Sequence, residues 1–208
     1  MDAVAIGQGE LIDWAVAGRA LPGQERSGDL HVVEPFPAGV LVGAVDGLGH
    51  GDEAAQAAQA AVDTLVQHAD EPPISLVRRC HEKLLATRGV AMSVASFARA
   101  NHTISWLGVG NVEGSLFRGN GRSQPARESL LLRGGVVGYK LPRLLPSVVP
   151  VEPGDVLVLV TDGIGGYSFD GLWKTEQPAR IAQDILARFA RGTDDALVLV
   201  ARYLGDAS

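Results

Sequence analysis

Apolar residues gather along this chain in short, uninterrupted runs bounded by glycine-rich segments. Three such runs occur, at residues 40–45, 156–160 and 196–200. A run of five or six apolar residues without alternation is typical of a strand that is buried on both faces. Asp46 follows the first run, Asp162 follows the second, and Asp194 precedes the third. We therefore expect three central strands, each with an aspartate at one end.

Helical periodicity predicts the other regular elements. Three helices are predicted, at residues 52–68, 74–87 and 176–190. The first begins with Asp52 and Glu53, whose negative charges complement the helix dipole, and the second follows two prolines. On the second helix Cys80 and His81 lie on the apolar face, so we expect a buried thiol and a half-buried packing histidine.

The middle of the chain changes to short segments with strand-like alternation. These segments are residues 90–98, 103–110 and 112–117. Turn-forming residues separate them, Ala100-Asn101-His102 first and Gly110-Asn111 second, which predicts two successive hairpins. The chain contains no internal repeat, low-complexity tract or interdomain linker. We expect one domain, residues 1–208, built of antiparallel sheets faced by helices.

Composition excludes several classes of protein. Hydrophobic residues make up 46% of the 208 residues and charged residues 20%, a balance typical of a globular domain. The net charge of −6 leaves no basic surface for nucleic acid, and the single cysteine excludes an intramolecular disulfide. The first residues lack the features of a signal peptide, and no apolar run approaches the ~18 residues that span a membrane. We expect a cytoplasmic protein with no membrane partner.

The three strand-end aspartates carry the candidate chemistry. Carboxylates at the mouth of an apolar core lose hydration and repel one another unless cations or protons compensate them. Mg²⁺ and Mn²⁺ suit this role, because they prefer oxygen ligands and retain several waters. The alternative is that each aspartate only caps a turn or a helix. The glycine-rich loop 47–51 is only weak evidence for a nucleotide-binding site. The chain has no Walker lysine, and the spacing of the glycines differs from the dinucleotide-binding fingerprint.

Four segments resemble the motifs of the protein phosphatase 2C superfamily, in the order of that family. They are SGD at residues 27–29, VGAVDGLGHGDEA at 42–54, TDGIGG at 161–166 and TDDALVLVAR at 193–202. The segments DGLGHG, GVGNVEGSLF and LLRGGVVGYKLP are most similar to the short bacterial, SpoIIE-like branch, and within it to stressosome feedback phosphatases of the RsbX type. One DGxG motif is a weak signal, whereas four motifs in order over the whole chain are a strong one.

The resemblance implies a fold and a metal site. The fold is α+β, a four-layer α-β-β-α sandwich of two antiparallel sheets flanked by helices, with two divalent cations, Mn²⁺ or Mg²⁺, at one end. The implied metal-binding residues are Asp29, Asp46, Gly47, Asp162 and Asp194. Asp46 is expected to bridge both ions, and Gly47 to bind one of them through its carbonyl oxygen. Asp195 is expected to orient the ligands.

The implied function is a protein serine/threonine phosphatase. Asp46 and Asp162 would hold the metals, and a metal-bridged hydroxide would hydrolyse phosphoserine or phosphothreonine. The expected substrate is a phosphorylated protein, a stressosome scaffold or similar bacterial stress-signalling regulator. Two alternatives remain: a non-catalytic binding module of the same pathway, and a metal-dependent phosphodiesterase or nuclease. The acidic charge disfavours the second.

Two positions depart from the eukaryotic pattern of this family. Leu48 stands where those relatives have a histidine that serves as a candidate general acid, and His50 either replaces it or only begins the next helix. Gln24 lies near the place of their phosphate-binding arginine, so Arg26 is the substrate-binding candidate, unless it is a solvated loop residue.

A recognition surface is expected beside Asp162. Residues 163–174 contain apolar and aromatic side chains of the kinds enriched in interface cores, namely Tyr167, Phe169, Leu172 and Trp173. These side chains either contact a protein substrate or cover the neighbouring sheet.

Overall fold

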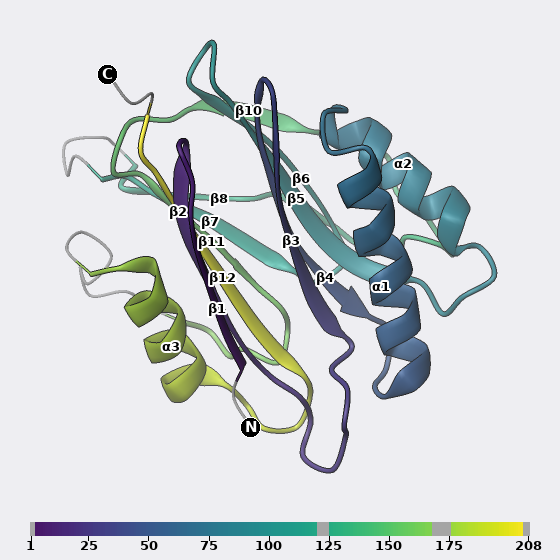
Figure 1. Ribbon diagram of the computed structural model, residues 1–208. Coiled ribbons are helices and arrows are strands. Elements are labelled where there is room, and N and C mark those ends of the chain that lie inside the picture. The colour runs from purple at the N-terminus through teal and green to yellow at the C-terminus, as the bar shows by residue number, and fades with distance from the viewer. Residues whose placement is uncertain (1–2, 120–124, 168–175, 206–208) are drawn as a thin grey trace.

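The computed structural model describes residues 3–119, 125–167 and 176–205. They form two sheets that face each other, with helices on both outer faces (Figure 1). One sheet has the order β1-β2-β12-β11-β7-β8 and the other β10-β6-β5-β4-β3, with β9 paired in parallel to β6. All other strand pairs are antiparallel. Helices α1 and α2 cover the second sheet and α3 covers the first. The four-layer α-β-β-α prediction is confirmed.

The strands of the first sheet are β1 (Ala3–Gln8), β2 (Ile12–Arg19), β12 (Ala196–Tyr203), β11 (Val156–Val160), β7 (Glu113–Phe117) and β8 (Arg127–Ser129). Those of the second are β10 (Ser147–Pro150), β6 (Thr103–Val109), β5 (Val90–Ala98), β4 (Gly39–Gly47), β3 (Asp29–Phe36) and β9 (Leu132–Arg133). The helices are α1 (Asp52–Gln67), α2 (Pro73–Leu84) and α3 (Pro178–Phe189).

Three hydrophobic clusters fill the spaces between the layers. One lies between the two sheets, one between the second sheet and helices α1 and α2, and one between the first sheet and α3. The packing of strand β11 explains why its sequence is continuously apolar. Leu157 and Leu159 belong to the cluster between the sheets, whereas Val156 and Val158 face α3. Both faces of the strand are therefore buried, as its pattern predicted.

The predicted helices are present with small differences at their ends. Helix α2 ends at Leu84 instead of residue 87, because the Thr87 hydroxyl donates to the Leu84 carbonyl oxygen at 2.8 Å and Gly89 then takes φ +80°. Cys80 is fully buried, and this burial raises the pKa of its thiol to about 12. His81 is half-buried and accepts a hydrogen bond from the Gly138 N–H at 2.9 Å.

One predicted hairpin is wrong. Strands β5 and β6 form the first hairpin, but Gly110-Asn111 does not turn the chain back along β6. The chain crosses there to the other sheet, where β7 pairs with β11 and β8. The local turn signal was correct, since Gly110 has φ +92°. The pairing partner is instead decided by burial, because β7 completes the apolar sheet face opposite β6.

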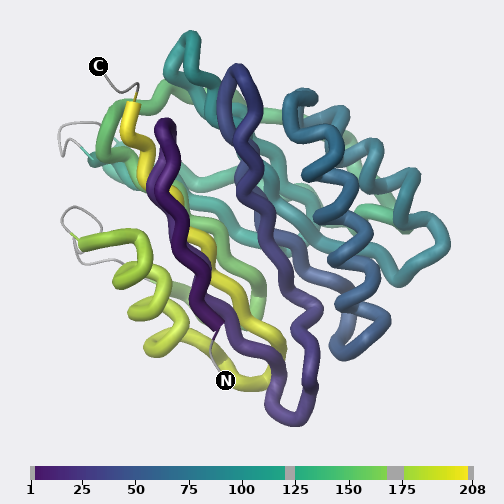
Figure 2. The backbone as a smooth tube through the Cα atoms, in the orientation of Figure 1, coloured from purple at the N-terminus to yellow at the C-terminus, as the bar shows by residue number. Residues whose placement is uncertain are grey.

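The pattern of the first 36 residues did not reveal strands β1, β2 and β3, which the structure contains. Strand β2 pairs with β12 along its whole length, so a strand from the start of the sequence lies beside one from its end (Figure 2). Strand β3 belongs to the other sheet, and residues 20–28 therefore pass from one sheet to the other. The short strands β8, β9 and β10 were also not predicted.

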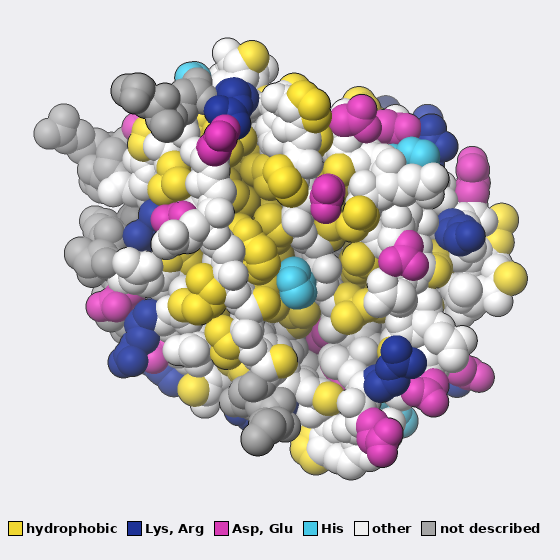
Figure 3. Space-filling model, viewed as in Figure 1, with side chains coloured by type: hydrophobic (Ala, Val, Ile, Leu, Met, Phe, Trp, Pro, Cys, Tyr) yellow, Lys and Arg dark blue, Asp and Glu magenta, His cyan; other side chains and the backbone are white. Residues whose placement is uncertain are grey.

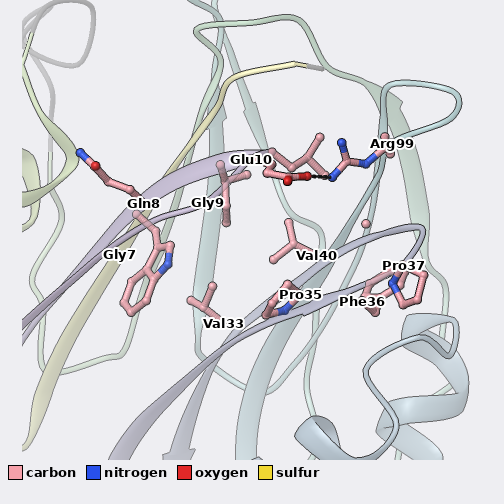
Figure 4. Close-up of a pocket in the computed structure, with 14 residues that line it drawn as sticks. Gly7, Gln8, Gly9, Glu10, Val33, Pro35, Phe36, Pro37, Val40 and Arg99 are labelled. Atoms are coloured by element: carbon pink, nitrogen blue, oxygen red, sulfur yellow. Dashed lines mark hydrogen bonds and ion pairs between the residues drawn. The ribbon is translucent and has the colours of Figure 1, made fainter. Parts of the chain in front are cut away.

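An apolar groove of about 760 Å³ opens between the edge strands β1 and β3. Hydrophobic side chains gather along the seam between these strands (Figure 3), and the Glu10–Arg99 ion pair, 3.0 Å, lies at its rim (Figure 4). The groove is lined by Phe36 and Gly39, the last pair of the β3–β4 ladder, whereas Asp29 and Asp46 form the first pair. The groove and the aspartates are thus at opposite ends of this ladder.

Two further features bear on the predictions. No helix in the described part of the chain is long and apolar enough to cross a membrane. Tyr167 is only 6% exposed, and its hydroxyl donates to the Ser115 hydroxyl at 3.1 Å, so this side chain packs in the core and is not available to a partner. Phe169, Leu172 and Trp173 of the expected recognition surface lie outside the described residues.

Candidate metal centre

Five aspartates converge at one end of the sandwich from the ends of four strands. Asp29 begins β3 and lies opposite Asp46 in the β3–β4 register. Asp162 follows β11, and Asp194 and Asp195 precede β12, the antiparallel neighbour of β11. The ends of β11 and β12 are joined because the Thr161 N–H donates to the Leu197 carbonyl oxygen at 3.1 Å. The predicted meeting of strand-end carboxylates is therefore present.

Two glycines allow these segments to approach closely. A Cβ atom at Gly47 would overlap the Ala54 carbonyl oxygen at the start of α1. A Cβ atom at Gly163 would overlap the Asp195 carbonyl oxygen. The turn after Asp162 and the segment before β12 can therefore touch only because residue 163 has no side chain.

Asp195 holds the loop 20–28 against the centre. It is only 2% exposed, and its two carboxylate oxygens accept hydrogen bonds from the Leu21 and Gly28 N–H groups, each at 2.7 Å. The Gly28 carbonyl oxygen in turn accepts from the Gly47 N–H at 3.0 Å. With both oxygens bonded to backbone, Asp195 is suited to position the segments that carry the other aspartates.

Asp29 is the most deeply buried of the candidate ligands, at 5% exposure. Burial raises the pKa of its carboxyl group well above the usual value, and the charge of Asp46 raises it further. The Thr161 hydroxyl opposes this shift by donating to Asp29 at 2.7 Å. Thr161 also accepts from the Leu197 N–H at 2.8 Å, so it links the Asp29 carboxylate to β12.

Asp46 and Asp162 are partly exposed and face the same region. Burial, followed by the charges of Asp162, Asp194 and Asp195, raises the pKa of Asp46 to about 7. Burial and the charge of Asp194 also raise the pKa of Asp162. Repulsion among these carboxylates means that each would be stabilised by a cation placed between them.

The sequence patterns did not indicate two neighbours of Asp162. The side-chain amide of Asn111 donates to the Asp162 carboxylate at 2.5 Å, and the positive charge of Arg191 opposes the rise in its pKa. Asn111 was assigned to a hairpin turn, and only the crossing of the chain between the sheets brings it to Asp162. Its position next to a glycine in GVGN was the one available signal.

The donor set fits hard divalent cations in its chemistry. It consists of carboxylates that raise one another's pKa. A bound divalent cation would relieve this repulsion, and carboxylate oxygens are the ligands that such cations prefer. In the described part of the chain, no three His, Cys, Asp or Glu side chains are gathered tightly enough to hold an ion by themselves. An ion here would therefore complete its coordination with water, as Mg²⁺ commonly does when one or two carboxylates bind it.

The remaining predicted residues lie around this centre without touching it. His50 is exposed between β4 and α1, and Arg26 is exposed in the loop 20–28. Within the described residues neither one bonds to the aspartates. Leu48, in the histidine position of the eukaryotic relatives, is half-buried, and its N–H donates to the Gly89 carbonyl oxygen at 3.1 Å.

Comparison with known proteins gives a consistent assignment. The family model described as Stage II sporulation protein E (SpoIIE) matches residues 37–204. The phosphoserine phosphatase RsbX of Bacillus subtilis (strain 168) is 25% identical over 183 residues, which cover 88% of this chain and 89% of RsbX.

Solved structures agree in fold. A chain from work on the bacterial stressosome as a modular system that controls secondary messenger signalling has a TM-score of 0.85 at 25% identity, covering 92% of this chain and 99% of its own. RsbX in complex with magnesium also has a TM-score of 0.85, at 20% identity, covering 97% of this chain and 100% of its own. The chain therefore belongs to the SpoIIE family of PP2C-type serine/threonine phosphatases.

Proposed function

We propose that this protein uses two divalent cations, Mn²⁺ or Mg²⁺, to hydrolyse phosphoserine or phosphothreonine in a phosphorylated protein. The observation that carries the proposal is the convergence of mutually repelling aspartates at one end of the sandwich. A magnesium complex is known for the structurally similar RsbX, which supports the choice of metal. The count of two ions rests on the resemblance to the PP2C superfamily and on the number of carboxylates available.

The proposed roles follow from the resemblance to the PP2C superfamily, and the electrostatic interactions among the aspartates support them. The charge of Asp46 interacts with Asp29 and with Asp162 and Asp194, so Asp46 would be the carboxylate shared by the two ions, one of which the Gly47 carbonyl oxygen and Asp29 would also hold. Asp162 and Asp194 would hold the other ion. When bound, the cations would lower the pKa of a water molecule and offset the charge on the phosphoryl oxygens.

Two proposed roles concern the substrate. His50 would protonate the leaving serine or threonine oxygen, and Arg26 would bind the phosphate. Both side chains are exposed, so a substrate could reach them without displacing a core residue. General acid catalysis of this kind contributes roughly 10² to 10⁴ in rate.

The proposed substrate is a stress-signalling regulator, a stressosome scaffold or similar protein. The similarity to the phosphoserine phosphatase RsbX and to the chain studied in the bacterial stressosome supports this choice. Recognition would extend over a surface of about 800 Å² per partner, the usual size of a specific interface. A cytoplasmic location stays a prediction.

The decisive experiment compares hydrolysis of three substrates with and without Mn²⁺. They are an intact phosphorylated regulator, its excised phosphopeptide and phosphoserine; bis(p-nitrophenyl) phosphate tests the diesterase alternative. We expect Mn²⁺-dependent release of phosphate from the monoesters, with the highest kcat/KM for the intact protein. The Asp46→Asn variant should be inactive, and Asp70→Asn, a change at an exposed aspartate after α1, should leave the rate unchanged. Absence of any metal-dependent monoester hydrolysis would refute the proposed function.

A further inference from the structure

Arg191 lies in the turn between α3 and β12 and is fixed to the turn that follows Asp162. Its backbone N–H donates to the Gly163 carbonyl oxygen at 2.9 Å, and the Gly165 N–H donates to the Phe189 carbonyl oxygen at 2.8 Å. These two hydrogen bonds form the isolated antiparallel bridge between Ile164 and Ala190. The backbone of residue 191 is therefore held beside a proposed metal ligand by two hydrogen bonds of one bridge.

The side chain of Arg191 points along the same turn. Its Nε atom lies 3.6 Å from the position that a Cβ atom at Gly165 would occupy, so the guanidinium end of the side chain lies over the turn that follows Asp162. Its positive charge partly opposes the rise in the pKa of Asp162 that burial and Asp194 cause. Arg191 is exposed, and within the described residues it forms no ion pair, so its donors are accessible to an anion from solvent.

The positive charge of Arg191 beside Asp162 disfavours metal binding. A positive charge beside Asp162 repels a divalent ion held by the same carboxylate, so arginine here needs a different explanation. Its exposure leaves the five N–H donors of the guanidinium available, and their planar arrangement matches two oxygens of a phosphate group.

We propose that Arg191 binds the phosphoryl group of the substrate on the Asp162 side of the centre. This inference rests on the proposed phosphatase function. Arg26, the phosphate-binding candidate proposed above, would act from the loop 20–28, and Arg191 adds a contact on the Asp162 side that the other arginines do not supply. Arg88 lies against Gly49 but is paired with Glu53, and Arg26 has no contact with the aspartates among the described residues.

The proposal makes two predictions of opposite sign. Arg191→Gln removes the charge and keeps the backbone bond to Gly163, so it should weaken the binding of inorganic phosphate to the Mn²⁺-loaded protein. Loss of a charged hydrogen-bond partner should increase the Kd of phosphate about 10- to 100-fold. The KM for a phosphopeptide should rise by a similar factor. The same change should leave the Kd of Mn²⁺ unchanged or lower it, because a repelling charge is lost.

The experiment uses isothermal titration calorimetry with MnCl₂ and then with inorganic phosphate, together with steady-state kinetics on a phosphopeptide. Arg191→Lys should restore part of the phosphate affinity. Arg188→Gln is the matched control, because Arg188 is an exposed arginine at the end of α3 whose guanidinium lies over the Phe189 ring. We expect this control to match the wild type within about 2-fold, as substitutions at exposed positions usually do.

Each outcome has a separate meaning. An unchanged Kd of phosphate in an active Arg191→Gln variant would overturn the inference and leave the phosphatase function standing. Weaker binding of both phosphate and Mn²⁺ would also overturn it, because the substitution would then have damaged the Asp162 turn. A large loss in Arg26→Gln with none in Arg191→Gln would assign the phosphate to Arg26. If the wild type hydrolyses no monoester, the proposed function fails, and calorimetry with phosphate still decides the role of Arg191.

Discussion

Replacing Asp46 with asparagine should stabilise the metal-free protein at neutral and alkaline pH. Asp46 is partly buried among Asp162, Asp194 and Asp195, and these surroundings raise its pKa to about 7 from the usual 3.8. The folded protein therefore binds this proton more tightly than the unfolded chain does. It follows that the free energy of unfolding falls as pH rises from about 4 to about 7, and that asparagine, which never ionises, avoids this loss.

The size of the effect follows from the shift in pKa. At 1.36 kcal/mol per pH unit, the difference between 3.8 and about 7 sets an upper limit of roughly 4 kcal/mol on the gain at pH 8. Asp46 keeps some contact with water, which screens its neighbours, so we expect about 1–3 kcal/mol. For a chain of this length that range corresponds to a rise in Tm of roughly 3–10 °C.

The measurement is thermal unfolding of the wild type and Asp46→Asn in EDTA between pH 4 and pH 8. The difference in Tm should be largest at pH 8 and should shrink toward pH 4, where the wild-type carboxyl group is protonated. Adding Mn²⁺ at 100 times its Kd should then increase the free energy of unfolding of the wild type by about 2.7 kcal/mol and raise its Tm, and should stabilise the variant much less. Asp70→Asn should behave as the wild type throughout. A variant less stable than the wild type in EDTA at pH 8 would refute the argument from repulsion.

Three further predictions test the residues of the centre. Asp162→Asn should reduce Mn²⁺-dependent turnover of a phosphopeptide to less than about a tenth, a barrier increase above ~1.4 kcal/mol, while circular dichroism shows an unchanged fold; a higher residual rate would remove Asp162 from the ligand set. His50→Ala should slow hydrolysis of a phosphoserine peptide by roughly 10² or more and p-nitrophenyl phosphate far less, because nitrophenolate leaves without a proton; equal slowing would return His50 to a structural role. Gly163→Ala should lower the free energy of unfolding in urea by about 1–3 kcal/mol, because the added methyl group overlaps the Asp195 carbonyl oxygen. Gly166→Ala, which has open space around the new Cβ atom, should change it by less than about 0.5 kcal/mol, and similar losses in both variants would contradict the steric explanation.

Local patterns in the sequence were sufficient for the central elements. The apolar runs of β4, β11 and β12 and the periodicity of the three helices each lie within a few consecutive residues, so they can be recognised without a fold. The motif order then predicted the four-layer sandwich and the meeting of Asp46, Asp162 and Asp194. Antiparallel pairing of β11 with β12 places Asp162 beside Asp194, whereas Asp46 lies on a strand of the other sheet, so only the motif resemblance predicted that it joins them.

Long-range contacts decided the rest. Whether β7 continues beside β6 or crosses to β11 depends on which apolar face it completes, and the Gly110-Asn111 turn is compatible with both paths. The crossing brings Asn111 to Asp162, and the packing of α3 on the first sheet brings Arg191 to the same carboxylate.

Side-chain patterns over a few residues were enough to locate the central strands and the three helices, and to show which carboxylates end those strands, whereas the six strands β1, β2, β3, β8, β9 and β10 were not evident from them. Only the tertiary structure decided which other groups surround those carboxylates. Asp195 accepts hydrogen bonds from Leu21, which is 174 residues away, and from Gly28. Such pairings depend on how two sheets pack against each other, and no local pattern encodes a contact between residues so far apart.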